Sequence, residues 1–333
     1  MKFEEIVSEL KKGNFAQIYL LTGEEPWYAD YITDYIAEHA IKKEEKDFNQ
    51  TILYGNDVNA TDIVHAARRY PMMAPKQVII VREAQNIKDW EALEHYLNAP
   101  APTTILVLNH RDKFDKRRKV WKLMTNKEFV TLETRKLKEY ETGPWINKYL
   151  KSIGLDIDPK ANVMLVEHLG SNLSNIVKAL DKLKVAVGKD VNTITPKHIE
   201  DYIGISKDYN AFELQDAIVK GDVLKANQII RIFGQNPNVY SIQLVIGALF
   251  GFFRKLMIYL ATQDKSQQNM ASKLGVPPFV VKNYQAAARR FNWTKCRQVV
   301  SLLREYDMRS KGFNNNSATH GDLLQELVFK IMH

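Results

Sequence analysis

A strand followed at once by a short turn and a helix, within residues 17–40, constrains the fold of this chain most. The apolar run at 17–22 predicts a buried strand, and the helical pattern begins at Trp27. This order is the architecture of a phosphate-binding loop. The turn of such a loop reads G-x-x-x-x-G-K-S/T, so that backbone amides and the lysine hold phosphates while the hydroxyl holds magnesium. The segment therefore predicts an α/β domain whose first turn can be compared with that motif.

The turn lacks the side chains on which phosphate binding depends. When the motif is counted from Gly23, its second glycine, its lysine and its hydroxyl residue fall on Tyr28, Ala29 and Asp30. A small apolar residue and an acid therefore stand where the motif needs a cation and a magnesium ligand. We interpret the segment as a degenerate phosphate loop that holds no triphosphate.

The charge of the turn supports the same interpretation. Glu24 and Glu25, followed by Pro26, place negative charge at the start of a helix. The helix dipole favours acids at this position, and these acids repel a triphosphate. The alternative interpretation of this segment is an ordinary acidic turn between a strand and a helix.

A second element of a nucleotide site is degenerate as well. The corresponding strand of a working site ends in acids that organise magnesium and water, whereas the apolar run at 78–81 is followed by Arg82 and Glu83. A cation thus stands where a metal-binding aspartate is expected. The sequence predicts a nucleotide-fold domain that serves as a scaffold for protein contacts, and it predicts no cofactor.

Composition and the single cysteine, Cys296, exclude several classes of protein. A chain of 333 residues with 45% hydrophobic and 26% charged residues is long enough for two or three globular domains. One cysteine permits no intramolecular disulfide framework and no multi-cysteine metal site, which fits a reducing cytosol. The eight histidines lack metal-ligand spacing, and no motif for a catalytic nucleophile occurs.

The sequence also predicts a cytoplasmic protein without membrane contact. Acidic residues near the N-terminus leave no room for the apolar region of an export signal. The most apolar stretch, 242–253, ends before Arg254 and Lys255 and is shorter than the roughly 20 residues that a bilayer span needs. We therefore expect this stretch to form a buried helix.

Three parts follow one another along the chain. Up to about residue 136, helices alternate with apolar strands at 17–22, 52–54, 78–81, 104–108 and 129–132, which predicts a mostly parallel sheet. Beyond it we expect no strand, but a small helical domain at 137–207 with helices at 140–152, 159–168, 173–187 and 196–202. The remaining segment, 208–333, predicts a larger helical bundle that includes an amphipathic helix at 293–308.

Positive charge is concentrated in the last third of the chain. The net charge is +8, and residues 208–333 contain 16 Lys and Arg against 9 Asp and Glu. A basic domain is the electrostatic footprint of a protein that works beside nucleic acid. A solvated helical surface can carry the same charge without binding anything, so both interpretations stay open here.

The order of the three parts leads to a resemblance. An α/β nucleotide-fold domain at 1–136, a small helical lid at 137–207 and a helical collar at 208–333 is the plan of clamp-loader subunits within the AAA+ class. Four segments narrow it further, at 11–26, 67–77, 113–119 and 274–282. Together with the degenerate turn at Gly23, they make the chain resemble the delta subunit of the bacterial DNA polymerase III clamp loader.

The resemblance implies a non-catalytic subunit that binds the ring-shaped sliding clamp and helps to open it for loading onto primed DNA. The implied partners are the sliding clamp, the other loader subunits and primed DNA within the complex. Met72 and Met73 stand where the family places a pair of large apolar residues that enters a hydrophobic pocket of the clamp. The alternative is that both methionines pack into this domain's own core.

Other candidate sites are weaker. The basic run 113–119 predicts a solvated helix face rather than a DNA site. Arg289 and Arg290 precede Phe291 and Trp293, and this mixture of charge and aromatic rings makes them candidates for contact with DNA or a neighbouring subunit. Two other functions stay open, namely an ATP-dependent AAA+ enzyme such as a helicase loader and a stand-alone DNA-binding protein.

Overall fold

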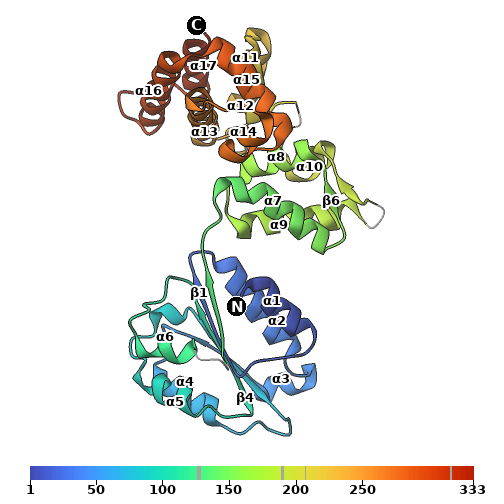
Figure 1. Ribbon diagram of the computed structural model, residues 1–333, viewed down its shortest axis with the longest axis vertical. Coiled ribbons are helices and arrows are strands. Elements are labelled where there is room, and N and C mark those ends of the chain that lie inside the picture. Colours follow the sequence, from blue (N-terminus) through green and yellow to red (C-terminus); the bar gives the residue numbers. More distant parts are fainter. Residues whose placement is uncertain (126–128, 189–190, 207, 316) are drawn as a thin grey trace. The chain divides into compact units, whose positions relative to one another are not determined.

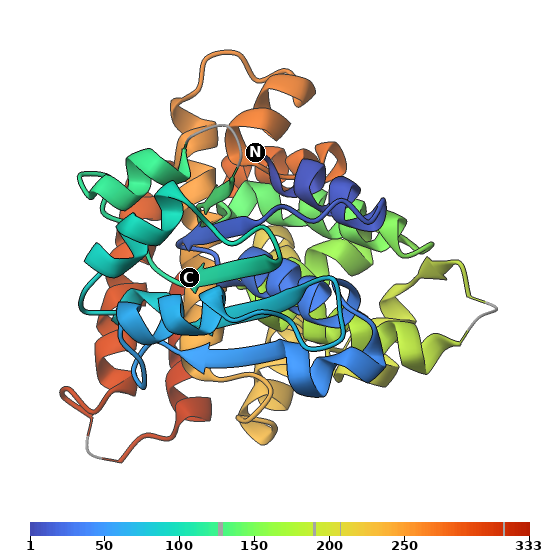
Figure 2. The same ribbon diagram turned by 90° about the horizontal axis from the view of Figure 1, so that it is seen from below.

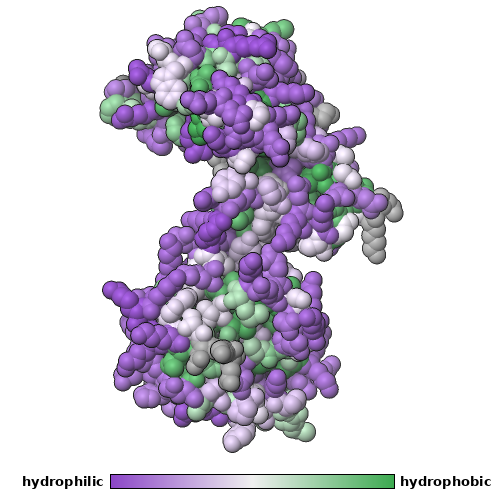
Figure 3. All heavy atoms as spheres, in the orientation of Figure 1, coloured by the Kyte–Doolittle hydropathy of each residue, from purple (hydrophilic) through white to green (hydrophobic). Residues whose placement is uncertain are grey.

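The chain forms two compact units, Met1–Lys136 and Leu137–His333. This computed structural model describes residues 1–125, 129–188, 191–206, 208–315 and 317–333 (Figure 1). The expected lid and collar both fall within the second unit, and residue 207, where the expected lid ends, lies outside the described residues. Polar and charged residues cover much of the face of each unit that Figure 3 displays.

The first unit is built on a five-stranded sheet in which all strands run parallel (Figure 2). The order across the sheet is β2-β3-β4-β1-β5. These strands are β1 (Ile18–Gly23), β2 (Gln50–Tyr54), β3 (Gln77–Arg82), β4 (Thr104–His110) and β5 (Val130–Thr134). The expectation of an α/β fold with a mostly parallel sheet is confirmed.

Helices cover both faces of this sheet (Figure 1). One face carries α1 (Phe3–Lys11) and α2 (Pro26–His39), and the other carries α4 (Ala60–Arg68), α5 (Glu91–Asn98) and α6 (Lys119–Met124). Because successive side chains of a strand point to opposite faces, Ile18 and Leu20 of β1 pack in one apolar core and Tyr19 and Leu21 in the other. Burial on both faces explains why the three inner strands, β1, β3 and β4, are nearly continuous apolar runs.

The basic run at 113–119 is not the helix face that its composition predicted. Most of the run is loop and turn, and α6 begins only at Lys119. Lys116 forms an ion pair with Glu133, and Arg117 forms one with Asp115.

A short helix, α3 (Lys46–Asn49), also belongs to this unit and ends where the edge strand β2 begins.

The second unit is mainly helical. Its first helices are α7 (Glu139–Ser152), α8 (Pro159–Leu169), α9 (Leu173–Val187) and α10 (Pro196–Ile203). Its later helices are α11 (Ala211–Lys220), α12 (Val223–Gln235), α13 (Ile242–Ala261), α14 (Gln267–Leu274), α15 (Val281–Arg290), α16 (Trp293–Ser310) and α17 (His320–Met332). Two short strands, β6 (Asp156–Ile157) and β7 (Thr193–Ile194), also pair in parallel. The expectation of no strand beyond 136 was therefore wrong, because two residues are too few to show an alternating pattern.

α13 is an apolar helix of the second unit, and it is longer than the sequence indicated. It has 20 residues, so Arg254 and Lys255 lie inside it rather than beyond its end. In the described part of the chain it is the one helix long and apolar enough to cross a membrane, judged by length and composition alone. However, Val245, Leu249 and Phe253 are buried in the core of the helical bundle. We therefore interpret α13 as a core helix.

Cys296 lies on the buried face of α16, together with Val299 and Leu303. Burial raises the pKa of its thiol to about 11, because the thiolate would lose its hydration. The thiol is therefore protonated near neutral pH and is a packing residue rather than a nucleophile.

Candidate partner-binding loop and degenerate nucleotide site

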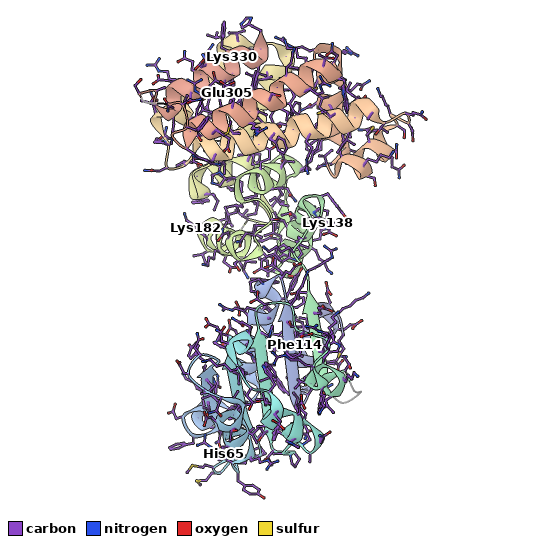
Figure 4. All side chains as sticks on the ribbon, turned by 90° about the vertical axis from the view of Figure 1, so that its left-hand side faces the viewer. His65, Phe114, Lys138, Lys182, Glu305 and Lys330 are labelled. Carbon is purple, nitrogen blue, oxygen red and sulfur yellow. The ribbon has the colours of Figure 1, made fainter. Side chains whose placement is uncertain are left out.

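The loop between α4 and β3, residues 69–76, carries the two methionines that the sequence singled out. Met72 is 61% exposed and Met73 is fully exposed, so neither packs into the core of its own unit. His65 lies on α4, the helix that leads into this loop, and Figure 4 shows it at one extremity of the unit. The alternative that both methionines are core residues does not agree with this structure.

Two buried amide side chains fasten the loop to the body of the unit. Asn49 accepts a hydrogen bond from the Met72 N–H (2.6 Å) and donates one from Nδ2 to the Met72 carbonyl (2.9 Å). Gln77, the first residue of β3, donates from Nε2 to the Arg69 carbonyl and to Thr104 Oγ1. The loop is therefore tied at its base by Gln77 and near its tip by Asn49.

The backbone of the loop adopts a conformation that needs such support. Met73 has a φ of 51°, in the left-handed region that residues with a β-carbon seldom occupy. Pro71 and Pro75 flank the two methionines and fix their own φ angles. A residue keeps this backbone conformation when the surrounding structure holds it there, and such residues cluster at binding sites.

Further exposed side chains surround the methionines in sequence and structure. Tyr70 is 88% exposed, and Phe48, which precedes Asn49, is 70% exposed. The cations Arg68, Arg69 and Lys76 flank the loop on either side and are exposed. The loop thus presents large apolar side chains with positive charge beside them.

The turn after β1 is short, and of its two residues Glu24 is exposed and Glu25 is buried. Gly23 ends the strand and α2 begins at Pro26, so Glu24 and Glu25 alone form the connection. Glu25 is the N-cap of α2 and accepts a hydrogen bond from the Trp27 N–H (3.4 Å). Burial raises the pKa of its carboxyl, an effect that this hydrogen bond only partly opposes.

Side chains from β4 and the segment after it contact the acids of this turn and of α2. Arg111 donates from Nη2 to both carboxylate oxygens of Asp30 (3.1 Å each). Asn109 donates to the same carboxylate (2.9 Å), and Lys113 forms an ion pair with Glu24 (3.0 Å). Asp30, which replaces the hydroxyl residue of the motif, and Glu24 of the turn are therefore each paired with a cation of the same chain.

The other residues of the expected nucleotide site have structural partners too. Ala29 is buried in the core between α2 and the sheet. Arg82, at the end of β3, forms an ion pair with Asp34 of α2 (2.6 Å). Glu83 has a φ of 55° and is the residue from which a short 3-10 turn begins. Among the described residues, no group of three His, Cys, Asp or Glu could hold a metal ion.

Gly23 allows β1 and β5 to approach closely at this turn. Its φ is +126°, and a Cβ added there would meet the backbone of Thr134 at a distance that real Cβ atoms do not reach. We expect Gly23→Ala to lower the free energy of unfolding by about 1–3 kcal/mol, measured by urea denaturation. Gly13→Ala is the matched control, because Gly13 also has a positive φ but open space around its Cβ. Equal losses from both variants would contradict the close-approach argument.

The second unit contains the other candidates. Arg290, at the end of α15, donates a hydrogen bond to the Met332 carbonyl of α17 (2.8 Å), so its guanidinium helps to hold the bundle together. Arg289 is exposed beside it. The second unit also has a cavity of about 1060 Å³, whose lining includes Phe212 and Phe252. None of the site residues expected from the sequence lines this cavity.

Asn49, Gln77 and Arg111 were not identified from the sequence. Asn49 is 23 residues from Met72, and Arg111 is 81 residues from Asp30. No spacing rule links side chains over such distances. Each residue comes close to its partner only when the parallel sheet has formed.

Comparison with known proteins agrees with this architecture. The family model of the DNA polymerase III delta subunit matches residues 19–133, and the model of the delta subunit's C-terminal domain matches residues 208–325. DNA polymerase III subunit delta of Bacillus subtilis (strain 168) is 27% identical over 319 residues, which cover 92% of this chain and 91% of that relative. The solved structure of the Bacillus subtilis DNA clamp loader delta protein (YqeN) is similar at a TM-score of 0.61, with 25% identity and 99% of both chains covered.

The parallel five-stranded sheet followed by helical domains defines an AAA+-like protein of the clamp-loader class. The two family models together match more than half of the chain. The chain belongs to the delta subunit family of the DNA polymerase III clamp loader.

Proposed function

We propose that this chain is the loader subunit that binds the sliding clamp and helps to open one of the clamp's interfaces, without hydrolysing nucleotide itself. The observation that carries the proposal is the exposure of Met72 and Met73 on a loop that buried side chains fasten. Unbranched, polarizable methionine side chains can fill an irregular apolar pocket. A loop that is already ordered also loses less conformational entropy when it binds.

The charge around the loop indicates the chemistry of the clamp surface that would bind it. Arg68, Arg69 and Lys76 place positive charge around the exposed methionines. Complementary interfaces pair opposite charges at their rims. We therefore infer that the pocket on the clamp is apolar at its centre and acidic at its edge. Titration of the labelled clamp with the whole chain tests the proposal, and failure to reach saturable binding would contradict it.

Several observations support the proposal that the degenerate nucleotide site is inactive. The turn between β1 and α2 contains only Glu24 and Glu25, and the position of the motif lysine, Ala29, faces the core. Asp30 is engaged by Arg111 and Asn109. A triphosphate would have to displace these contacts and approach several carboxylates, which is unfavourable.

We expect the purified chain to show no magnesium-dependent binding of a fluorescent ATP analogue. Asp30→Thr restores the hydroxyl that the motif requires, but it should restore neither binding nor hydrolysis, because Arg82 still stands where a metal-binding acid would be needed. An ATPase subunit of the loader serves as the positive control. Saturable magnesium-dependent binding by the unaltered chain would favour the ATP-dependent enzyme instead.

As a clamp-loader subunit, the chain acts together with other loader subunits. We propose that the basic collar, 208–333, provides the assembly contacts, and that Arg289 adds to the attraction of primed DNA within the complex. A cytoplasmic location follows from this role. A stand-alone DNA-binding protein would instead bind DNA tightly as an isolated chain, which a direct titration distinguishes.

A further inference from the structure

We propose that Asn49 is a positioning residue for clamp binding, which fixes the main chain of Met72 so that Met72 and Met73 are presented in one conformation. The inference rests on the proposed clamp contact of these methionines. Asn49 itself is buried and cannot be part of the contact surface, since only 2% of it is exposed. Its effect on a partner must therefore pass through the loop.

An amide side chain matches the chemistry of the two hydrogen bonds. Met72 offers one donor, its N–H, and one acceptor, its carbonyl, and Asn49 satisfies both at 2.6 and 2.9 Å. An aspartate at this position would accept but could not donate when ionised, and a leucine would do neither. The pair of bonds thus fixes both the position and the orientation of the Met72 peptide groups.

The place of Asn49 in the fold explains why it can act as an anchor. It is the last residue of α3 and leads directly into β2, which is paired with β3 in the sheet. Gln77 begins β3 and fastens the other side of the same loop. The loop is therefore held from the end of α3 and from the start of β3, and Met73 beside the Asn49 anchor keeps its positive φ.

Without this anchor, the loop would have to be ordered at the moment of binding. Restricting backbone and side-chain freedom costs free energy, and this cost would be subtracted from the affinity for the clamp. Because Asn49 orders the loop in the unbound protein, the free-energy cost of ordering is incurred during folding and not during binding. A merely structural role would instead lower the stability of the unit and leave the affinity of the folded protein unchanged.

A matched control exists in the same unit. Asn109 is also buried, with 1% exposed, and its amide group donates to Asp30 and Thr33 of α2. Asn109→Ala therefore removes a buried amide of the same size without touching the loop. Asn49→Leu provides a second test of the anchor, because it removes both hydrogen bonds while keeping the branching and the number of heavy atoms of the side chain, and so leaves no cavity.

The experiment compares whole-chain variants in two measurements. Amide hydrogen exchange at Met72, without clamp, reports the anchor directly, and we expect faster exchange in Asn49→Ala and Asn49→Leu but not in Asn109→Ala. Trypsin cleavage after Arg69 and Lys76 should accelerate in the same two variants. Titration of the sliding clamp, well below the unfolding temperature of each variant, should show roughly tenfold weaker binding for the Asn49 variants and wild-type affinity for Asn109→Ala.

Two results would overturn the inference. One is unchanged Met72 exchange in the Asn49 variants, which would show that the side chain does not hold the loop. The other is faster exchange with unchanged clamp affinity, which would show that order in the loop does not matter. Failure of the proposed function is distinguished separately, because Met72→Ala with Met73→Ala would then bind the clamp like the unaltered chain.

Discussion

Replacing both Met72 and Met73 with alanine is expected to weaken binding to the sliding clamp by about 2–4 kcal/mol, the range for truncating central apolar anchors of an interface. Both side chains are exposed and make no core contact, so the free energy of unfolding should change little. The measurement is a binding titration of the whole chain against the clamp, accompanied by thermal unfolding of the variant.

The matched control removes exposed aliphatic side chains elsewhere. Val185 of α9 and Leu224 of α12 are both strongly exposed in the second unit. Val185→Ala with Leu224→Ala should leave the clamp affinity unaltered, since neither residue lies in the unit that carries the loop. If the methionine variant binds as tightly as this control while remaining folded, the loop is not the clamp-binding element.

A fragment that ends at Lys136 is expected to retain clamp binding and to lose association with the other loader subunits. This boundary is where the first compact unit ends, and β5, the last strand of its sheet, is complete before it. The fragment keeps Asn49, Gln77 and both methionines. It lacks the segment matched by the C-terminal domain family, residues 208–325, to which we assign loader assembly.

Gel filtration with the clamp, and separately with the remaining loader subunits, measures both properties. The complementary fragment, 137–333, is the matched partner and should enter the loader without binding the clamp. Its helices α11 to α17 share one buried core, which supports its use as a separate fragment. Co-elution of the 1–136 fragment with the loader subunits, at the affinity of the whole chain, would refute the assignment of the collar as the assembly domain.

Local and periodic features of the fold were predictable. The five strands were recognised because each is an apolar run bounded by polar residues, and α9 was placed at its observed bounds, Leu173–Val187, by an apolar stripe. The full length of α13 was missed, because Arg254 and Lys255 interrupt its apolar pattern although the helix continues through them. β6 and β7 were missed because their pairing depends on a partner segment and not on local composition.

The candidate site was predictable only in part. The methionines were identified through the resemblance to the delta subunit family, while composition alone favoured a core position for them. Their exposure is decided by tertiary structure, because the end of α4 lies beside the start of β3 and leaves the connecting loop outside the packed layers. The anchor at Asn49 depends on the position of α3 and β2 beside that loop.

The sequence by itself determined that the turn at Gly23 lacks the side chains of a phosphate loop, since that conclusion needs only the identities of Tyr28, Ala29 and Asp30. The tertiary structure alone decided what happens at the same place. The parallel register of β1 and β4 brings Arg111 to Asp30 across 81 residues of chain. Hydrogen bonds and ion pairs depend on a separation of a few ångströms in space and not on the number of residues between the partners. These contacts could therefore be established only from the folded sheet.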